Sequence, residues 1–127
     1  MASLADPRSL ADAIATFALD RKAEEVVVID VTGRCSYADY LVVASGTSDR
    51  HVQAIAESVS GQLHASGRRV LGREGLREGQ WALIDAGDVV LHVFHAFTRS
   101  EVDLDGLWKE APRHRCAAEP PRIAQLK

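Results

Sequence analysis

The sequence predicts a single α/β domain in which a mixed sheet of about five strands is covered by flanking helices. The chain has 127 residues, which is the usual size of one domain. Apolar residues make up 46% and charged residues 26% of it, a composition typical of chains that fold around a hydrophobic core. Apolar residues recur at helical spacing in some segments and form short β-branched runs in others, so helices and strands should alternate.

The first segments predict a helix followed by two strands. Asp6 is a helix-capping residue and Pro7 suits the first helical turn, so a helix should begin there and continue to about Lys22. The β-branched runs at residues 26–29 and 40–44 predict two strands. Because Thr32, Gly33 and Arg34 supply a turn between them, we expect these strands to pair antiparallel.

The middle of the chain predicts a second helix and a short strand. Thr47, Ser48 and Asp49 supply capping hydroxyl groups and an acidic first turn, and apolar residues follow at helical spacing until Gly67. A helix of this length can serve as a crossover connection between parallel strands. Residues 69–71 are therefore predicted as a strand that runs parallel to the strand preceding the helix.

The last third of the sequence predicts a hairpin and a short helix. Residues 81–84 and 89–94 are predicted as strands, because they are apolar and flank a turn that contains Gly87. The segment Thr-Arg-Ser-Glu that begins at Thr98 has the form of a capping box. A helix should start there and end near Pro112.

Charge divides the chain into an acidic body and a basic tail. The formal net charge is -3, but residues 112–127 hold 4 Lys and Arg against 1 Glu, so residues 1–111 carry the negative excess. We therefore predict one domain over residues 1–111 and a basic, flexible tail over residues 112–127. An acidic body favours a basic protein partner over the phosphate backbone of a nucleic acid.

The sequence also predicts a cytoplasmic protein without a membrane segment or a bound cofactor. No apolar run approaches the roughly 20 residues that span a bilayer, and residues 1–7 lack the pattern of a secretory signal. Cys35 and Cys116 form neither a disulfide framework nor a metal-ligand spacing, so both should be free thiols. His92 and His95 would point to opposite faces of one strand, which makes them poor joint ligands of a metal.

The segment that most resembles a binding or catalytic site is the turn that contains Gly46, Thr47 and Ser48. It leads from a strand into a helix N-terminus, where backbone N–H groups can hold an anion. The same residues are also what a strand-to-helix turn and a helix cap require. Walker and Gly-x-Gly-x-x-Gly patterns are absent, and no serine lies in a nucleophile-elbow pattern. The sequence thus indicates no catalytic set, and a protein that is not an enzyme.

Several motifs follow one another between about Leu10 and Pro112. They are SYADY at residues 36–40, ASGTSDRHV at 44–52, GQW at 79–81, LID at 83–85, GDVV at 87–90 and HVF at 92–94. In order and approximate spacing they resemble the ribosomal silencing factor, or Iojap, family. The sequence departs from the family pattern at four positions. Leu41, Ala86 and Val102 stand where aromatic residues are usual, and Asp105 stands where Glu is usual.

The resemblance implies a nucleotidyltransferase-like topology and a role on the ribosome. Members of this family bind the large ribosomal subunit through its fourteenth ribosomal protein and sterically prevent the small subunit from joining. Translation is thereby repressed when nutrients are limiting. The resemblance also implies a homodimer in the free state and leaves room for a peripheral contact with ribosomal RNA.

We expect the hairpin and the helix after it to contact the ribosomal protein. Trp81 would be the apolar anchor, because peripheral Trp is a common interface residue, although burial in a small core is the more common role for such a Trp. Asp85 and Asp88 would face Lys or Arg of the partner. The complete predicted contact set is Trp81, Asp85, Asp88, His92, Arg99 and Trp108.

Two alternatives remain open at the level of sequence. One is a nucleotidyltransferase-like or phosphate-binding protein that uses Gly46, Thr47 and Ser48, although no Asp-x-Asp pair follows in a predicted strand to hold Mg²⁺. The other is direct binding of RNA by basic residues of the tail, which are Arg113, Arg115 and Arg122.

Overall fold

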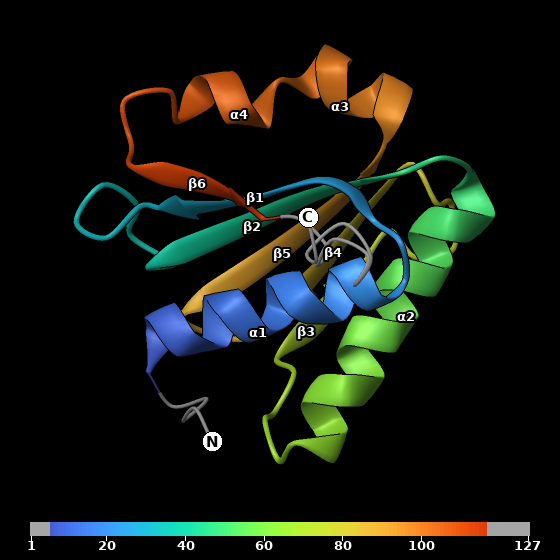
Figure 1. The fold of residues 1–127 in the computed structure, drawn as a ribbon, viewed down its shortest axis with the longest axis horizontal. Helices are drawn as coiled ribbons and strands as arrows, with labels where there is room; N and C mark the ends of the chain where they lie inside the picture. The colour runs from blue at the N-terminus through green and yellow to red at the C-terminus, as the bar shows by residue number, and fades with distance from the viewer. Residues whose placement is uncertain (1–5, 117–127) are drawn as a thin grey trace, which may run out of the picture.

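The computed structural model describes residues 6–116, which form a single α/β domain with an open mixed sheet. Within these residues the sheet has six strands in the order β3-β4-β5-β2-β1-β6, with α1 and α2 on one side and α3 and α4 on the other (Figure 1). The elements are α1 (Pro7–Asp20), β1 (Glu24–Asp30), β2 (Tyr40–Gly46), α2 (Asp49–Ala65), β3 (Gly72–Glu74), β4 (Trp81–Asp85), β5 (Val89–His95), α3 (Ala96–Val102), α4 (Leu104–Leu107) and β6 (Arg113–Cys116).

The predicted start of α1 and the predicted pairing of β1 with β2 are confirmed. The Asp6 carboxylate accepts a hydrogen bond from the backbone N–H of Ser9 at 3.1 Å, and Pro7 occupies the first turn of the helix. The strands β1 and β2 pair antiparallel, with Val28 opposite Val42. Local capping and turn chemistry therefore determine this half of the fold.

The predicted third strand is wrong in both position and direction. The strand β3 begins at Gly72 rather than Arg69, and it pairs antiparallel with β4 at the edge of the sheet. The parallel neighbour of β2 is β5 instead. A central parallel strand must bury both of its faces, and β5 does so from Val89 to Phe94, whereas the segment before Gly72 carries exposed Arg69.

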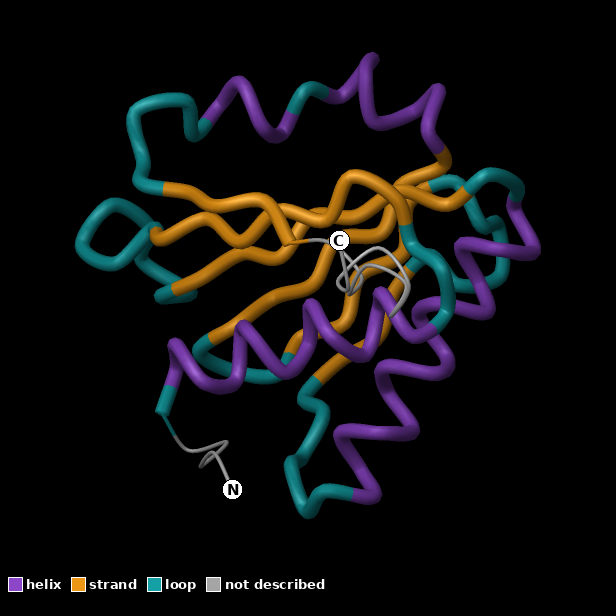
Figure 2. Tube along the Cα trace, in the orientation of Figure 1, coloured by secondary structure: helices purple, strands orange, loops and turns teal. Residues whose placement is uncertain are grey.

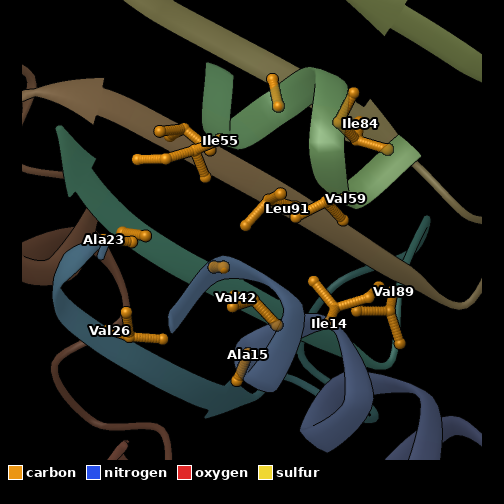
Figure 3. Close-up of a cluster of buried hydrophobic side chains, with 14 of the residues drawn as sticks. Ile14, Ala15, Ala23, Val26, Val42, Ile55, Val59, Ile84, Val89 and Leu91 are labelled. Atoms are coloured by element: carbon orange, nitrogen blue, oxygen red, sulfur yellow. The ribbon is translucent and has the colours of Figure 1, made fainter. Parts of the chain in front are cut away.

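Two hydrophobic clusters lie on opposite faces of the sheet. The larger cluster joins α1 and α2 to the sheet, and Figure 3 shows Ile14 and Ala15 of α1 and Ile55 and Val59 of α2 gathered around Leu91 of β5. The smaller cluster joins α4 to the other face of the central strands. Strand residues alternate between the two clusters, so that neighbours along β4 and β5 serve different faces. Figure 2 shows the strands as a layer between the two sets of helices.

The helix after β5 begins earlier than predicted and is interrupted. His95 caps α3 through its Nδ1 atom, which accepts from the N–H of Phe97 at 3.3 Å, so Thr98 does not start the helix. The hydroxyl of Thr98 instead donates to Gln80 at 2.7 Å. Asp103 adopts a left-handed conformation, with φ of 53°, and separates α3 from α4. Its carboxylate then caps α4.

Part of the predicted tail belongs to the sheet. Residues 113–116 form β6, which pairs antiparallel with β1 at the edge opposite β3, so the ordered fold extends past residue 111. Arg113 donates to the carbonyl oxygens of Asp105 and Trp108, and Arg115 lies 3.2 Å from the carboxylate of Glu25. These two arginines therefore contact the body of the domain. Arg122 and the rest of the predicted tail from residue 117 onward lie outside the described residues.

Within residues 6–116, no helix has both the length and the apolar character needed to cross a membrane.

Candidate partner-binding surface

An aromatic cluster lies on the face of β4 and β5 opposite to α1 and α2. Trp81 of β4 stacks on Phe94 of β5, with ring centroids 5.0 Å apart and planes inclined by 29°. The indole N–H of Trp81 donates to Nδ1 of His92 at 3.0 Å. Trp81 is 40% exposed, whereas Phe94 is completely buried and His92 is only 4% exposed. One aromatic ring is thus presented to solvent on a rigid aromatic support.

His92 is a neutral imidazole with a defined tautomer. Burial lowers the pKa of His92 to about 4, so the ring carries no charge at neutral pH. The indole nitrogen of Trp81 can only donate, which makes Nδ1 the acceptor and places the ring proton on Nε2. That Nε2 atom is buried and has no hydrogen-bond partner within residues 6–116. His92 is therefore a buried histidine that supports Trp81 from below rather than an exposed contact residue.

Asp85 and Asp88 bracket the turn between β4 and β5, as the sequence predicts. The Asp85 carboxylate accepts from the N–H of Gly87 at 2.8 Å, and Gly87 has a positive φ of 95°. The carbonyl oxygen of Asp88 accepts from the N–H groups of Asp39 and Tyr40. The Asp88 side chain itself is exposed, and its carboxylate contacts no cation within the described part of the chain. One carboxylate thus shapes the turn and the other faces solvent.

Arg99 connects α3 to three other parts of the fold. Its guanidinium makes a bidentate contact with Asp105, with bonds of 3.2 and 2.9 Å, and also donates to the hydroxyl of Ser45 and the carbonyl of Glu25. Glu25 has a positive φ of 50° at an irregularity of β1, so Arg99 satisfies a carbonyl that the strand pairing leaves exposed. Arg99 and Asp105 are both mostly buried, with 13% and 26% of their side chains exposed. Arg99 therefore has a positioning role, because it joins α3 to α4, β1 and β2.

The same pair sets the ionisation of Asp105. Burial by itself raises the pKa of Asp105, but the hydrogen bonds and the positive charge of Arg99, with a further contribution from Arg113, outweigh burial and hold this pKa below its ordinary value. Asp105 therefore stays ionised and paired at neutral pH, although Glu is usual at its position. The shorter side chain still reaches Arg99 in a bidentate geometry.

Trp108 and several exposed apolar residues complete this side of the molecule. Trp108 caps α4 and packs partly buried against the smaller cluster, and its indole nitrogen has no partner within residues 6–116. Phe97, Val102 and Leu107 of α3 and α4 are exposed by 65%, 38% and 71%. Sequence patterns did not indicate a surface role for these three residues, although Val102 departs from the family pattern. They could be recognised as apolar residues of two short helices whose side chains do not pack into the core.

The turn into α2 is built for packing. A Cβ atom at Gly46 would come within 2.8 Å of the Val52 side chain, so glycine is required by the contact between the turn and the helix. The N–H of Thr47 donates to Nδ1 of His51 at 2.9 Å, and the hydroxyl of Ser48 caps the N–H of His51. Nε2 of His51 then donates to the carbonyl of Arg21 at 2.9 Å. These bonds use donors that a bound phosphate would need, so the geometry favours a structural role for Gly46, Thr47 and Ser48.

Fold and site together define a single-domain α/β protein that presents an aromatic and acidic sheet face beside two short helices. The family described as "Ribosomal silencing factor during starvation" matches residues 4–126. The chain is similar to the "Ribosomal silencing factor RsfS" of Bacillus subtilis, with 43% identity over 93 residues that cover 73% of this chain and 79% of that protein. It belongs to the ribosomal silencing factor family.

Solved structures support the same assignment. A crystal structure of a Chromobacterium violaceum protein matches with a TM-score of 0.80 and 30% identity, and the match covers 91% of both chains. A crystal structure from Bacillus halodurans matches with a TM-score of 0.76 and 33% identity, covering 86% of this chain and 99% of that one. The resemblance identified in the sequence motifs is thereby confirmed.

Proposed function

We propose that this chain binds the large ribosomal subunit through its fourteenth ribosomal protein and blocks joining of the small subunit, repressing translation in the cytoplasm when nutrients are limiting. The observation that carries the proposal is the β4–β5 face, defined by Trp81, Asp85, Asp88, His92 and Phe94. One hairpin carries an exposed Trp at the start of β4 and the carboxylates of Asp85 and Asp88 at the turn where β4 ends. The names of the relatives supply the ribosomal context.

The physical chemistry of this face suits a basic protein partner. Trp81 offers a flat apolar surface whose orientation is fixed by its bond to His92, so little side-chain entropy is lost on binding. The exposed carboxylate of Asp88 can pair with Lys or Arg at the edge of the contact, where charge mainly sets specificity and the rate of encounter. A steric blocker requires only affinity and bulk, and no bond chemistry.

The predicted contact residues divide into two groups under this proposal. Trp81, Asp85 and Asp88 meet the partner directly. His92 orients Trp81, and Arg99 and Trp108 hold α3 and α4 in position through the contacts described above. The exposed apolar residues of α3 and α4 extend the apolar surface. We also propose that the free chain is a homodimer, because an exposed apolar surface of this kind favours self-association until a partner covers it.

The decisive experiment is sedimentation of the purified protein with large ribosomal subunits that contain or lack the fourteenth protein, followed by addition of small subunits. We expect co-sedimentation only when that protein is present, and loss of subunit joining as the factor approaches saturation. Failure to co-sediment, or normal joining at saturating factor, would refute the proposal. Translation in a reconstituted extract then reports whether the block represses synthesis.

A further inference from the structure

A second surface lies at the β3 edge of the sheet, in a groove between α2 and the segment around β3. The groove has a volume of about 610 Å³ and is open to solvent. Glu57, Ser60, Gly61 and His64 line it from α2, and Arg69, Val70, Gly72 and Arg73 line it from the other wall. Neither the aromatic face nor the turn into α2 uses these residues.

Gly61 is unusual because it lies inside a 17-residue helix with no packing reason to be glycine. Glycine inside a helix is destabilising relative to alanine. A Cβ atom added at Gly61 would meet nothing within 4 Å, so the free chain has room for a side chain there. This contrasts with Gly46, whose missing Cβ is explained by contact with Val52. Close approach of a ligand to the helix backbone is a role that glycine commonly serves.

The groove also carries positive charge within an acidic body. Two arginines, Arg69 and Arg73, line the groove together with one carboxylate, that of Glu57, although the chain as a whole has a net charge of -3. Arg73 pairs with Glu57, and Arg68 donates to the carbonyl of Ala86 at 2.7 Å. The Arg69 side chain contacts no acceptor within residues 6–116, and it is exposed in the lining of the groove.

We propose that this groove binds the phosphodiester backbone of ribosomal RNA next to the protein that the β4–β5 face contacts. The inference rests on the proposed function for the presence of the large subunit. The Arg69 guanidinium can hold a phosphate in a bidentate geometry, and Ser60 and His64 provide further polar groups on the facing wall. Gly61 allows a nucleotide backbone to approach the helix.

The position of the groove supports binding at both surfaces at once. Gly72 lines the groove and is the cross-strand partner of Asp85, which belongs to the β4–β5 face. The two surfaces are therefore adjacent at one edge of the sheet. An open groove of this kind suits a polymer backbone that enters and leaves it, and Val70 is the one large apolar side chain in its lining.

The first test measures binding of the full chain to large subunits over a range of salt concentrations. Arg69→Gln should weaken binding several-fold at physiological salt and reduce the slope of log K against log salt by about 1, as expected for one lost phosphate contact. Arg34→Gln is the matched control, because Arg34 is exposed and lies outside the groove. Equal slopes for the two variants would overturn the proposal.

The second test separates binding from folding. Gly61→Gln should raise Tm by about 3 to 6 °C, because it removes a helix glycine, and should weaken binding to large subunits at least tenfold, because the new side chain fills the groove. Ala65→Gln places the same side chain on α2 outside the lining and should bind normally. Normal binding by Gly61→Gln would overturn the proposal.

A third measurement distinguishes this proposal from the proposed function. NMR titration of the free chain with a mixed-sequence RNA duplex should shift the amides of residues 60–73, and Arg69→Gln should abolish the shifts. If large subunits do not bind but these shifts occur, the proposed function fails and the groove assignment stands. If tripolyphosphate shifts the amides and RNA does not, the groove serves a small phosphorylated ligand and the assignment to RNA is wrong.

Discussion

Trp81 of β4 donates its indole N–H to Nδ1 of His92 on β5, at 3.0 Å, and the two side chains lie on the same face of neighbouring strands. Of the two residues that share this bond, Trp81 is 40% exposed and His92 is buried. The bond requires an unprotonated Nδ1. The orientation of the exposed ring therefore depends on His92 staying neutral.

Acid should destabilise the fold through His92. Burial lowers the pKa of His92 from 6.5 to about 4 in the folded chain, so between these values the unfolded chain binds the proton more readily. Stability should therefore fall as pH decreases from 6.5 toward 4, by a total on the order of 3 kcal/mol. Urea unfolding curves at a series of pH values measure this dependence.

The control for this prediction is His92→Gln, which cannot titrate. The variant should be less stable at neutral pH, but the difference between it and the unsubstituted chain should shrink as the pH falls through the same window. A constant difference at all pH values would show that His92 does not titrate as its burial implies. NMR of the imidazole nitrogens should independently show the neutral tautomer with the proton on Nε2.

Substitutions at the β4–β5 face should weaken binding to the large subunit without unfolding the chain. Asp88→Lys reverses an exposed charge, and Trp81→Ala removes the exposed ring. Each should reduce affinity by roughly tenfold to a hundredfold, which corresponds to about 1.4 to 2.8 kcal/mol. Sedimentation with large subunits at fixed salt gives the affinities.

Two variants serve as controls for that measurement. Asp20→Lys makes the same charge change on α1, on the other side of the sheet, and should bind within about twofold of the unsubstituted chain. Trp81→Phe keeps an aromatic ring over Phe94 but loses the bond to His92, so it should retain more affinity than Trp81→Ala. Equal losses for Asp20→Lys and Asp88→Lys would mean that net charge, and not this face, determines binding.

The fold class could be predicted from sequence because capping and periodicity act locally. Asp6 and Ser48 cap helices where the pattern places them. Strand order could not be predicted, because Arg69–Leu71 and Val89–His95 both suit a strand locally, and only burial on two faces selects the second for the centre of the sheet. Strand β6 has four polar or polarisable residues, and its pairing with β1 is a tertiary effect.

For the candidate site, the sequence located the turn and the hairpin correctly but did not predict what every selected residue does. The sequence placed Asp85 and Asp88 at a turn and Trp81 at its hairpin, which the structure confirms. It placed Arg99 in the contact set because polar and aromatic residues cluster at the matched motif positions. In the structure, Arg99 bonds to Glu25 and Ser45, which lie 74 and 54 positions away from it in the chain. Periodicity within one segment carries no information about such contacts.

Removing the Arg99 side chain should therefore destabilise the domain. Arg99→Gln would leave Asp105 without its bidentate partner and the carbonyl of Glu25 without its donor. We expect a loss of about 2 to 4 kcal/mol in the free energy of unfolding. Arg99→Lys should recover only part of it, because an ammonium group cannot reproduce the planar fork. Equilibrium urea denaturation measures these differences.

The matched control for Arg99 is the exposed pair of Arg8 and Asp12. These side chains lie 3.6 Å apart on α1, and each is more than half exposed. Arg8→Gln should change stability by less than about 0.5 kcal/mol, because water screens an exposed helix pair. A loss at Arg8 as large as that at Arg99 would contradict the positioning role assigned to Arg99.

Gly79 should be among the positions least tolerant of substitution in the chain. It has a positive φ of 73°, and a Cβ atom there would lie 2.6 Å from the carbonyl oxygen of Asp49, at the start of α2. Gly33 also has a positive φ, of 77°, but a Cβ atom there would meet nothing within 4 Å. Comparing substitutions at Gly33 and Gly79 therefore separates the cost of backbone strain from the cost of disturbing the close contact between the loop and α2.

We expect Gly33→Ala to cost about 1 kcal/mol, from strain alone, and Gly79→Ala to cost at least about 3 kcal/mol, because the clash with Asp49 adds to the strain. Gln80 follows Gly79 and holds Asp49 through its side chain and His95 through its carbonyl oxygen, so a displaced loop would also disturb the strand that carries Trp81. Urea denaturation followed by circular dichroism measures both costs. Equal costs would show that the loop moves away from α2 without loss, and that its contact with Asp49 does not stabilise the fold.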